Sequence, residues 1–244
     1  MRLVITVSRQ LGSLGSYIAA RVAEALELRY VDREIIRRVQ QEVVPDPSVL
    51  EDAASLKAIA DRMIQAMEAL PLVPCIASAT LREAYAFDER VAALMEAQHL
   101  ELKEAQQRLR AQAAAEELAE PHLELMRHLV RGLAQRGDAI ILGRGAQVLL
   151  QDRRNAVHVR IHAPVPLRIQ RLMDREGITR SEAERRVHAT DSARAGFLQR
   201  VYGYDWEDPT LYHLVLNTGH IGESLAAALI VRTAQEVRQP LLPT

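Results

Sequence analysis

The sequence predicts an α/β fold in which a five-stranded parallel sheet carries helices on both faces. Short apolar runs alternate along the chain with segments whose apolar residues recur at helical spacing. The first run leads directly into a glycine- and serine-rich turn, and two helical stretches interrupt the alternation further on. The five predicted strands are residues 2–7, 29–31, 138–142, 156–162 and 211–217.

The first predicted unit is a strand, a loop over residues 8–16 and a helix over residues 16–27. A loop with few side chains lets backbone N–H groups face an anion, and the start of the helix adds partial positive charge. The unit therefore predicts a phosphate site around Gly12 and Gly15.

Asp32 ends the second predicted strand, and a helix is predicted to follow over residues 33–41. A polar residue at the carboxyl end of a parallel strand lies where open α/β sheets bind ligands. An aspartate there is also a good N-cap for the next helix. Both roles fit Asp32.

The middle of the chain is helical in pattern and acidic in charge. Residues 45–120 contain 14 acidic and 7 basic residues. An acidic helical insertion of this kind serves either as a cover for a substrate or as a partner surface, including a surface for a homodimer. Its predicted helices are residues 48–70, 79–97, 99–118 and 121–136.

The third strand ends in Gly143-Arg144-Gly145. Glycines on both sides of an arginine allow close backbone approach and place a fixed charge at the sheet edge. The alternative is a tight turn with a surface arginine, and the pattern favours the binding role.

Residues 144–200 hold 12 arginines, no lysine and 6 acidic residues. Guanidinium groups fork onto phosphate oxygens, so as a set these arginines favour an anion site, although any one of them can simply coat a solvated helix. Ser181 and Glu184 fit a capping box and predict that a helix starts there and runs to about residue 202. On that helix Asp191 and Arg194 are spaced either to pair with each other or to face a ligand.

Composition excludes several classes of protein. The chain has 244 residues, a net charge of −1 and one cysteine, so neither a strong field for nucleic acid nor an internal disulfide is expected. No apolar run is long enough to span a membrane, and a cytoplasmic protein without membrane or nucleic-acid partners is the expectation. No H-E-x-x-H or G-x-S-x-G string occurs.

Several motifs together resemble the cytidylate kinase-like family, bacterial relatives of CMP kinase within the P-loop nucleoside monophosphate kinases. The matching pieces are ITVSRQLGSLG, VDREII, ILGRGAQVLL, HVRIHAP with LRIQRLMDREGIT, and TDSARA followed by YGYDWEDPTLYHLVLNT. They occur in order over residues 1–44 and 137–231, while the middle matches poorly. The resemblance implies a three-layer kinase core of residues 1–44 and 137–244, an arginine-rich lid at about 175–203 and a helical insertion at 45–136.

The resemblance also implies ATP as phosphoryl donor, Mg²⁺ as cofactor, and a small-molecule acceptor such as CMP or dCMP. Asp32 and Arg144 are expected at the acceptor. The residues expected to bind the nucleotide and its phosphates are Ser8, Gly12, Ser13, Gly15, Ser16, Arg168 and Arg171. The residues expected to act in catalysis are Arg9, Arg144, Asp191 and Arg194.

The loop departs from the P-loop pattern G-x-x-x-x-G-K-[ST], because Leu14 replaces a glycine and no lysine is present. Arg9 is the nearest cation that can substitute, and Ser13 or Ser16 is the expected contact to Mg²⁺. Two hypotheses follow: an ATP-dependent nucleoside monophosphate kinase, or a weak or inactive kinase-like domain that binds a nucleotide or anion in regulation or scaffolding.

Overall fold

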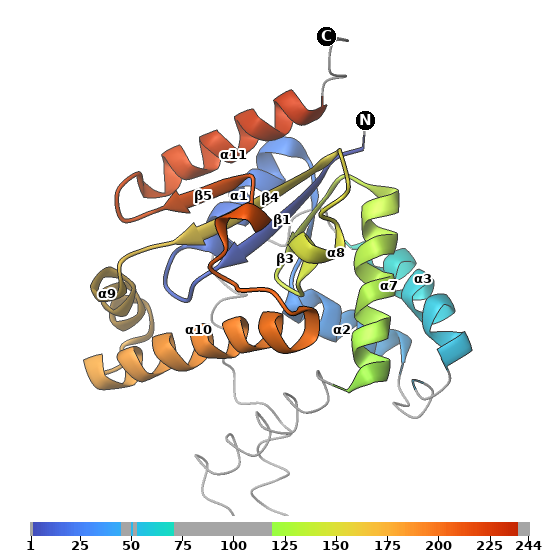
Figure 1. Ribbon diagram of the computed structural model, residues 1–244, viewed down its shortest axis with the longest axis horizontal. Helices are drawn as coiled ribbons and strands as arrows, with labels where there is room; N and C mark the ends of the chain where they lie inside the picture. Colours follow the sequence, from blue (N-terminus) through green and yellow to red (C-terminus); the bar gives the residue numbers. More distant parts are fainter. Residues whose placement is uncertain (1, 45–49, 51–52, 71–118, 239–244) are drawn as a thin grey trace, which may run out of the picture.

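The computed structural model describes residues 2–44, 50, 53–70 and 119–238 (Figure 1). The predicted helices at 79–97 and 99–118 lie outside these residues. The strands are β1 (Val4–Arg9), β2 (Arg29–Val31), β3 (Ala139–Leu142), β4 (Ala156–His162) and β5 (Leu214–Asn217). The helices are α1 (Gly15–Leu26), α2 (Arg33–Val43), α3 (Ala53–Ala69), α7 (Glu120–Arg136), α8 (Ala146–Leu149), α9 (Val165–Glu176), α10 (Arg180–Tyr202) and α11 (Gly222–Arg238), with a 3-10 turn at Pro209–Leu211.

The five strands form one parallel sheet in the order β2-β3-β1-β4-β5, as the strand–helix alternation predicts. The first strand runs two residues further than predicted. Ser8 pairs with Arg160 and Arg9 with Ile161, so both belong to β1 and not to the loop. The last strand begins later than predicted, because Asp208 caps the 3-10 turn that precedes it.

Helices cover both faces of the sheet. On one face α1 and α11 pack on alternate strand residues, among them Ile5, Ile140 and Val159. On the other face α2, α3 and α7 pack on the intervening residues, including Val4, Val31 and Ile141. This alternation is the pattern expected for a parallel sheet with helices on both faces.

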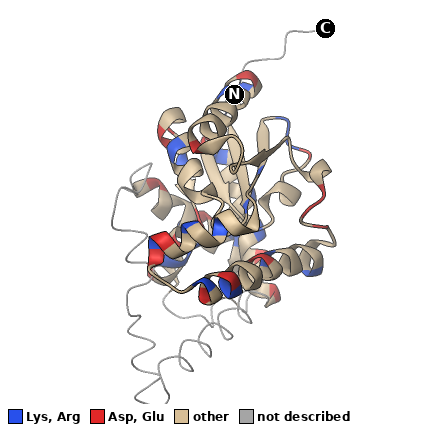
Figure 2. Ribbon diagram, turned by 90° about the vertical axis from the view of Figure 1, so that its left-hand side faces the viewer, with Lys and Arg blue, Asp and Glu red and all other residues tan. Residues whose placement is uncertain are grey.

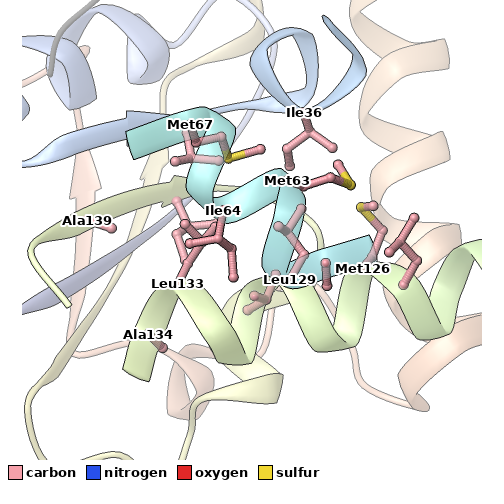
Figure 3. Close-up of a cluster of buried hydrophobic side chains, with 14 of the residues drawn as sticks. Ile36, Met63, Ile64, Met67, Met126, Leu129, Leu133, Ala134 and Ala139 are labelled. Carbon is pink, nitrogen blue, oxygen red and sulfur yellow. The ribbon is translucent and has the colours of Figure 1, made fainter. Parts of the chain in front are cut away.

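The described ends of the expected insertion are part of the second layer. Helices α3 and α7 lie side by side, and their buried residues contact the sheet and α2 (Figure 3). Met63 and Leu129 are fully buried, and both lie in the cluster that contains Ala139 of β3. The helices at the start and end of residues 45–136 therefore pack as core, and the separate helical insertion stays a prediction for the residues between them.

Helices α9 and α10 lie beyond the carboxyl ends of the strands (Figure 1). The start of α10 differs from the predicted capping box at Ser181, because Thr179 is the N-cap and its hydroxyl accepts from the Glu182 N–H. Positive and negative residues lie side by side on both helices (Figure 2). Arg186, for example, pairs with Glu176 and Glu182 at this solvated face. Such arginines fit the alternative given in the sequence analysis, in which an arginine coats a solvated helix and does not bind an anion.

No helix among the described residues is both long and apolar enough to cross a membrane.

Candidate functional site

The site begins at the loop between β1 and α1. Gly12 and Leu14 both have positive φ, at 78° and 63°, which turns the chain sharply before the helix. A leucine is rarely held in this conformation, and here its side chain packs on the core cluster beneath α1. Ser13 is fully buried, and its hydroxyl donates to the Gln10 carbonyl at 2.8 Å. Ser13 therefore holds the turn together from inside, and the hydroxyl that borders the adjacent pocket is that of Ser16.

The start of α1 keeps its main-chain donors open. No side chain caps this helix. Within the described part of the chain, the N–H groups of Leu14, Gly15 and Ser16 make no hydrogen bond to another main-chain group. Open amides at a helix start, together with the helix dipole, attract an anion.

Arg9 lies beside Gly15, the first residue of α1. A Cβ on Gly15 would overlap the Cβ of Arg9, so only glycine lets this arginine pass beside the helix start. Desolvation lowers the pKa of the Arg9 guanidinium from its ordinary value, and nearby Tyr30 and Asp32 act against that shift. Its buried Nε has no hydrogen-bond partner among the described residues.

Two pockets meet at this arginine. The larger, of about 630 Å³, lies over the loop between α2 and α9. The smaller, of about 260 Å³, lies over the end of β3. Arg9 and Arg194 line both pockets, so these two positive side chains lie at the boundary that the pockets share.

The two pockets differ in charge. The larger one combines arginines with the carboxylates of Asp32, Glu34 and Asp174. The smaller one is lined by four arginines and by no carboxylate of the described residues. Those four arginines are Arg9, Arg33, Arg144 and Arg194. The smaller pocket therefore suits an anion, and the larger one suits an anion together with a cation.

Helix α10 is bonded directly to the loop. Asp191 accepts from the Leu11 N–H at 3.0 Å and pairs with Arg168 at 2.5 Å. Arg194 donates to the Arg9 carbonyl at 2.6 Å. One helix of the expected lid thus contacts the end of β1 at Arg9 and the start of the loop at Leu11.

Arg168 and Arg171 take different positions from each other. Arg168 is buried and donates to the Ala163 and Leu11 carbonyls, which places its guanidinium behind the loop and not in a pocket. These bonds brace the loop from behind, and the phosphate contact expected of Arg168 stays a prediction. Arg171 lines the larger pocket and reaches Thr218 at the end of β5.

Asp32 takes both of the places that the sequence left open, as the N-cap of α2 and at the edge of the ligand pocket. Its carboxylate caps α2 by accepting from the Ile35 N–H at 3.0 Å, and it lines the larger pocket. Burial raises the pKa of the adjacent Tyr30, and the Asp32 charge adds to that shift. Arg144 lines the smaller pocket, so the two residues expected at the acceptor lie in different pockets.

Sequence reasoning named Ser8 as a binding residue but missed the residues that surround it in the wall of the smaller pocket. Ser8 is buried, and its hydroxyl accepts from the Trp206 indole N–H at 2.6 Å. Gln147, Phe197 and Trp206 line the pocket, and the sequence analysis gave none of them a role, although Gln147 and Trp206 lie in motifs of the family resemblance. The only signal was that Gln147 follows the Gly143-Arg144-Gly145 turn, since the tryptophan is brought there from 198 residues away.

The described residues hold no group of three or more His, Cys, Asp or Glu side chains arranged to bind a metal. Mg²⁺ commonly uses one or two carboxylates together with phosphate oxygens and water. Asp32 and Ser16, which both line the larger pocket, fit that donor set.

Comparison with known proteins gives the family. The model of the cytidylate kinase-like family matches residues 4–220. A cytidylate kinase of Methanopyrus kandleri is 32% identical over 101 residues, which are 38% of this chain and 52% of that protein. The chain thus matches about half the length of this curated relative.

Among solved structures, an uncharacterized protein from Eubacterium ventriosum aligns over 96% of this chain and 99% of its own, with 15% identity and a TM-score of 0.58. It supports the fold. A shikimate kinase from Acinetobacter baumannii covers 98% of this chain and 97% of its own at 12% identity, but its TM-score is only 0.43. The match over residues 4–220, which includes the loop, both pockets and α10, shows that the chain belongs to the cytidylate kinase-like family.

Proposed function

We propose that this protein transfers a phosphoryl group from ATP to a nucleoside monophosphate such as CMP or dCMP. The observation that carries the proposal is that the two pockets share Arg9 and Arg194. A donor in the larger pocket and an acceptor in the smaller one would meet at these two guanidinium groups. Phosphoryl transfer needs this kind of positioning and charge neutralisation, and little covalent chemistry from the protein.

Each part of the site has a task in this proposal. The open amides of Leu14, Gly15 and Ser16 bind donor phosphates. Arg9 supplies the charge that a P-loop lysine supplies elsewhere, since its side chain passes beside Gly15 at the start of α1 and lines both pockets. Mg²⁺, held by Asp32 and Ser16 with phosphate oxygens, would neutralise charge on the donor. Arg144 binds the acceptor phosphate in the smaller pocket.

A second candidate is a domain that binds nucleotide without turnover. The observations that favour it are the missing loop lysine, the leucine at residue 14 and the Ser13 hydroxyl that is turned inward. A coupled assay for ADP release with ATP, Mg²⁺ and a panel of nucleoside monophosphates separates the two. Thermal shift with ATP or CMP measures binding independently, because a ligand of the native state stabilises it.

We expect ADP release that depends on the acceptor, and a loss of about 100-fold or more in kcat for Arg9→Ala. Arg232→Ala, an exposed arginine on α11, is the matched control and should keep full activity. ATP binding without ADP release from any acceptor would favour the second candidate. Unchanged turnover in Arg9→Ala would remove the role given to Arg9.

A further inference from the structure

Arg144 has an uncommon backbone conformation at the edge of the smaller pocket. Its φ is 61°, and Gly143 and Gly145 on either side have φ of 75° and 66°, so three successive residues are left-handed. A residue other than glycine is strained in this region and keeps the conformation only where its surroundings hold it. The Arg144 side chain lines the pocket, so whatever holds the turn also sets where this guanidinium lies.

Tyr202, the last residue of α10, contacts this turn. Its hydroxyl donates to the Arg144 carbonyl at 3.3 Å, and no main-chain donor bonds that carbonyl in the described part of the chain. A Cβ on Gly145 would lie only 2.2 Å from the Tyr202 ring, so the ring lies directly against the backbone of the turn. Burial raises the pKa of the Tyr202 hydroxyl, although nearby Arg127 opposes the shift, so the phenol keeps its proton at neutral pH. Tyr202 therefore restrains the turn both by a donated hydrogen bond and by close contact.

The same helix also bonds to the phosphate loop. Asp191 accepts from the Leu11 N–H, and Arg194 donates to the last carbonyl of β1. Tyr202 lies about two helical turns beyond Arg194. A single helix therefore contacts the loop of the larger pocket and the turn that carries an arginine of the smaller one.

We propose that Tyr202 is a positioning residue, which holds the left-handed turn and thereby fixes Arg144 in the smaller pocket. The inference rests on the proposed function, because Arg144 is there assigned to the acceptor phosphate. Tyr202 is not part of the lining of either pocket, so its effect on a ligand passes through Arg144. Its hydroxyl serves the arginine backbone and leaves the guanidinium available to an anion.

Hydrogen exchange of the protein without ligand tests the hold on the turn. The amides of Ala146 and Val148 bond back to the glycine carbonyls of the turn, and they should exchange about three- to tenfold faster in Tyr202→Phe. The amides of α11 should keep their rates, which a general loss of stability would not allow. Tyr204→Phe, the same change in the same apolar cluster, is the matched control and should leave both sets unchanged. Unchanged exchange at the turn in Tyr202→Phe would overturn the proposal.

Calorimetric titration tests whether that hold serves Arg144. Tyr202→Phe should raise the dissociation constant of CMP about fivefold and leave that of ATP unchanged. In an Arg144→Ala background the same change should have no further effect on CMP, because the residue through which Tyr202 acts is gone. An equal loss of affinity for both nucleotides, or an equal loss in both backgrounds, would overturn the proposal. Absence of CMP binding would contradict the proposed function alone, because the exchange rates still decide whether Tyr202 holds the turn.

Discussion

At the scale of single residues, Gly15 is present because Arg9 needs its space. Gly15 opens α1 without positive φ, so an alanine there is favoured by helix propensity and opposed chiefly by the overlap with Arg9, with the Ser13 hydroxyl a second close neighbour at 3.3 Å. We expect Gly15→Ala to lower the free energy of unfolding by about 1–3 kcal/mol in urea denaturation. Ser16→Ala, at the next position of the same helix, should cost less.

The overlap can be isolated by a double-mutant cycle. In an Arg9→Gly background the Cβ of residue 9 is absent, and Gly15→Ala should then cost little. An equal cost in both backgrounds would mean that some other contact requires the glycine.

His158 predicts how stability depends on pH. Burial lowers its pKa to about 4, and the stacked His213 adds to the shift while the Leu150 carbonyl opposes it. In the unfolded chain a histidine has a pKa near 6.5. Above that pH the contribution of His158 to the free energy of unfolding is therefore fully present. Between about pH 6.5 and pH 4 only the unfolded chain binds the proton, and unfolding becomes easier by up to about 3 kcal/mol.

Urea denaturation at pH 7, 5.5 and 4 measures this dependence. His158→Gln should flatten the fall in stability across that range, while His188→Gln, at an exposed position on α10, should leave it unchanged. A fall just as steep in His158→Gln would assign the pH dependence to other groups.

At the scale of elements, Asp191 couples α10 to the loop. Its carboxylate lies between the Leu11 N–H and the buried Arg168 guanidinium. Asp191→Ala leaves that guanidinium without its counter-charge, and we expect a loss of about 3 kcal/mol in the free energy of unfolding. Removing Glu236, which pairs with Arg232 on the exposed face of α11, should cost under about 1 kcal/mol.

A second variant, Asp191→Asn, distinguishes a positioning role from direct contact with a ligand. If Asp191 acts by holding the loop, Asp191→Asn should lose stability and ATP affinity together, because an amide oxygen still accepts from the Leu11 N–H but gives the buried Arg168 no counter-charge. Loss of activity in Asp191→Asn with full ATP affinity and an unchanged melting temperature would instead place Asp191 in direct catalysis.

The elements were predictable where local pattern decides them. The predicted strands at 29–31 and 156–162 have their observed bounds, because apolar runs end there at turn or capping residues. Ser8 and Arg9 gave no local sign of belonging to a strand, since only pairing with β4 extends it. The start of α10 was misplaced because Thr179 and Ser181 are both capping residue types, and the fold selects the first.

The candidate site was predictable in its loop and not in its walls. The glycines and Arg9 lie together in sequence, so the phosphate site could be inferred from adjacent residues. Gln147 and Trp206 are brought to the smaller pocket by α8 and by the segment before β5, and the family motifs that contain them gave neither residue a role. Arg168 was assigned to phosphate by the family resemblance, and its position behind the loop depends on contacts that span 157 residues.

At the scale of the whole molecule, the packing of α3 and α7 predicts cooperative unfolding. Leu129 of α7 is fully buried in the cluster that also contains residues of β1, β2 and β3. Trp206 lies in a separate cluster with Leu198, Leu211 and Tyr212. If both clusters belong to one folding unit, a cavity made in the first must also destabilise the second.

Leu129→Ala should therefore lower the free energy of unfolding by about 2–5 kcal/mol. Far-UV circular dichroism and Trp206 fluorescence should report a single shifted transition in urea, since coincident probes are the mark of two-state unfolding. Leu229→Ala, the same change at a position of α11 that is 39% exposed, should cost far less. A shift seen by circular dichroism but not by the tryptophan would mean that α3 and α7 unfold apart from the sheet, which would support the domain boundary predicted at residue 136.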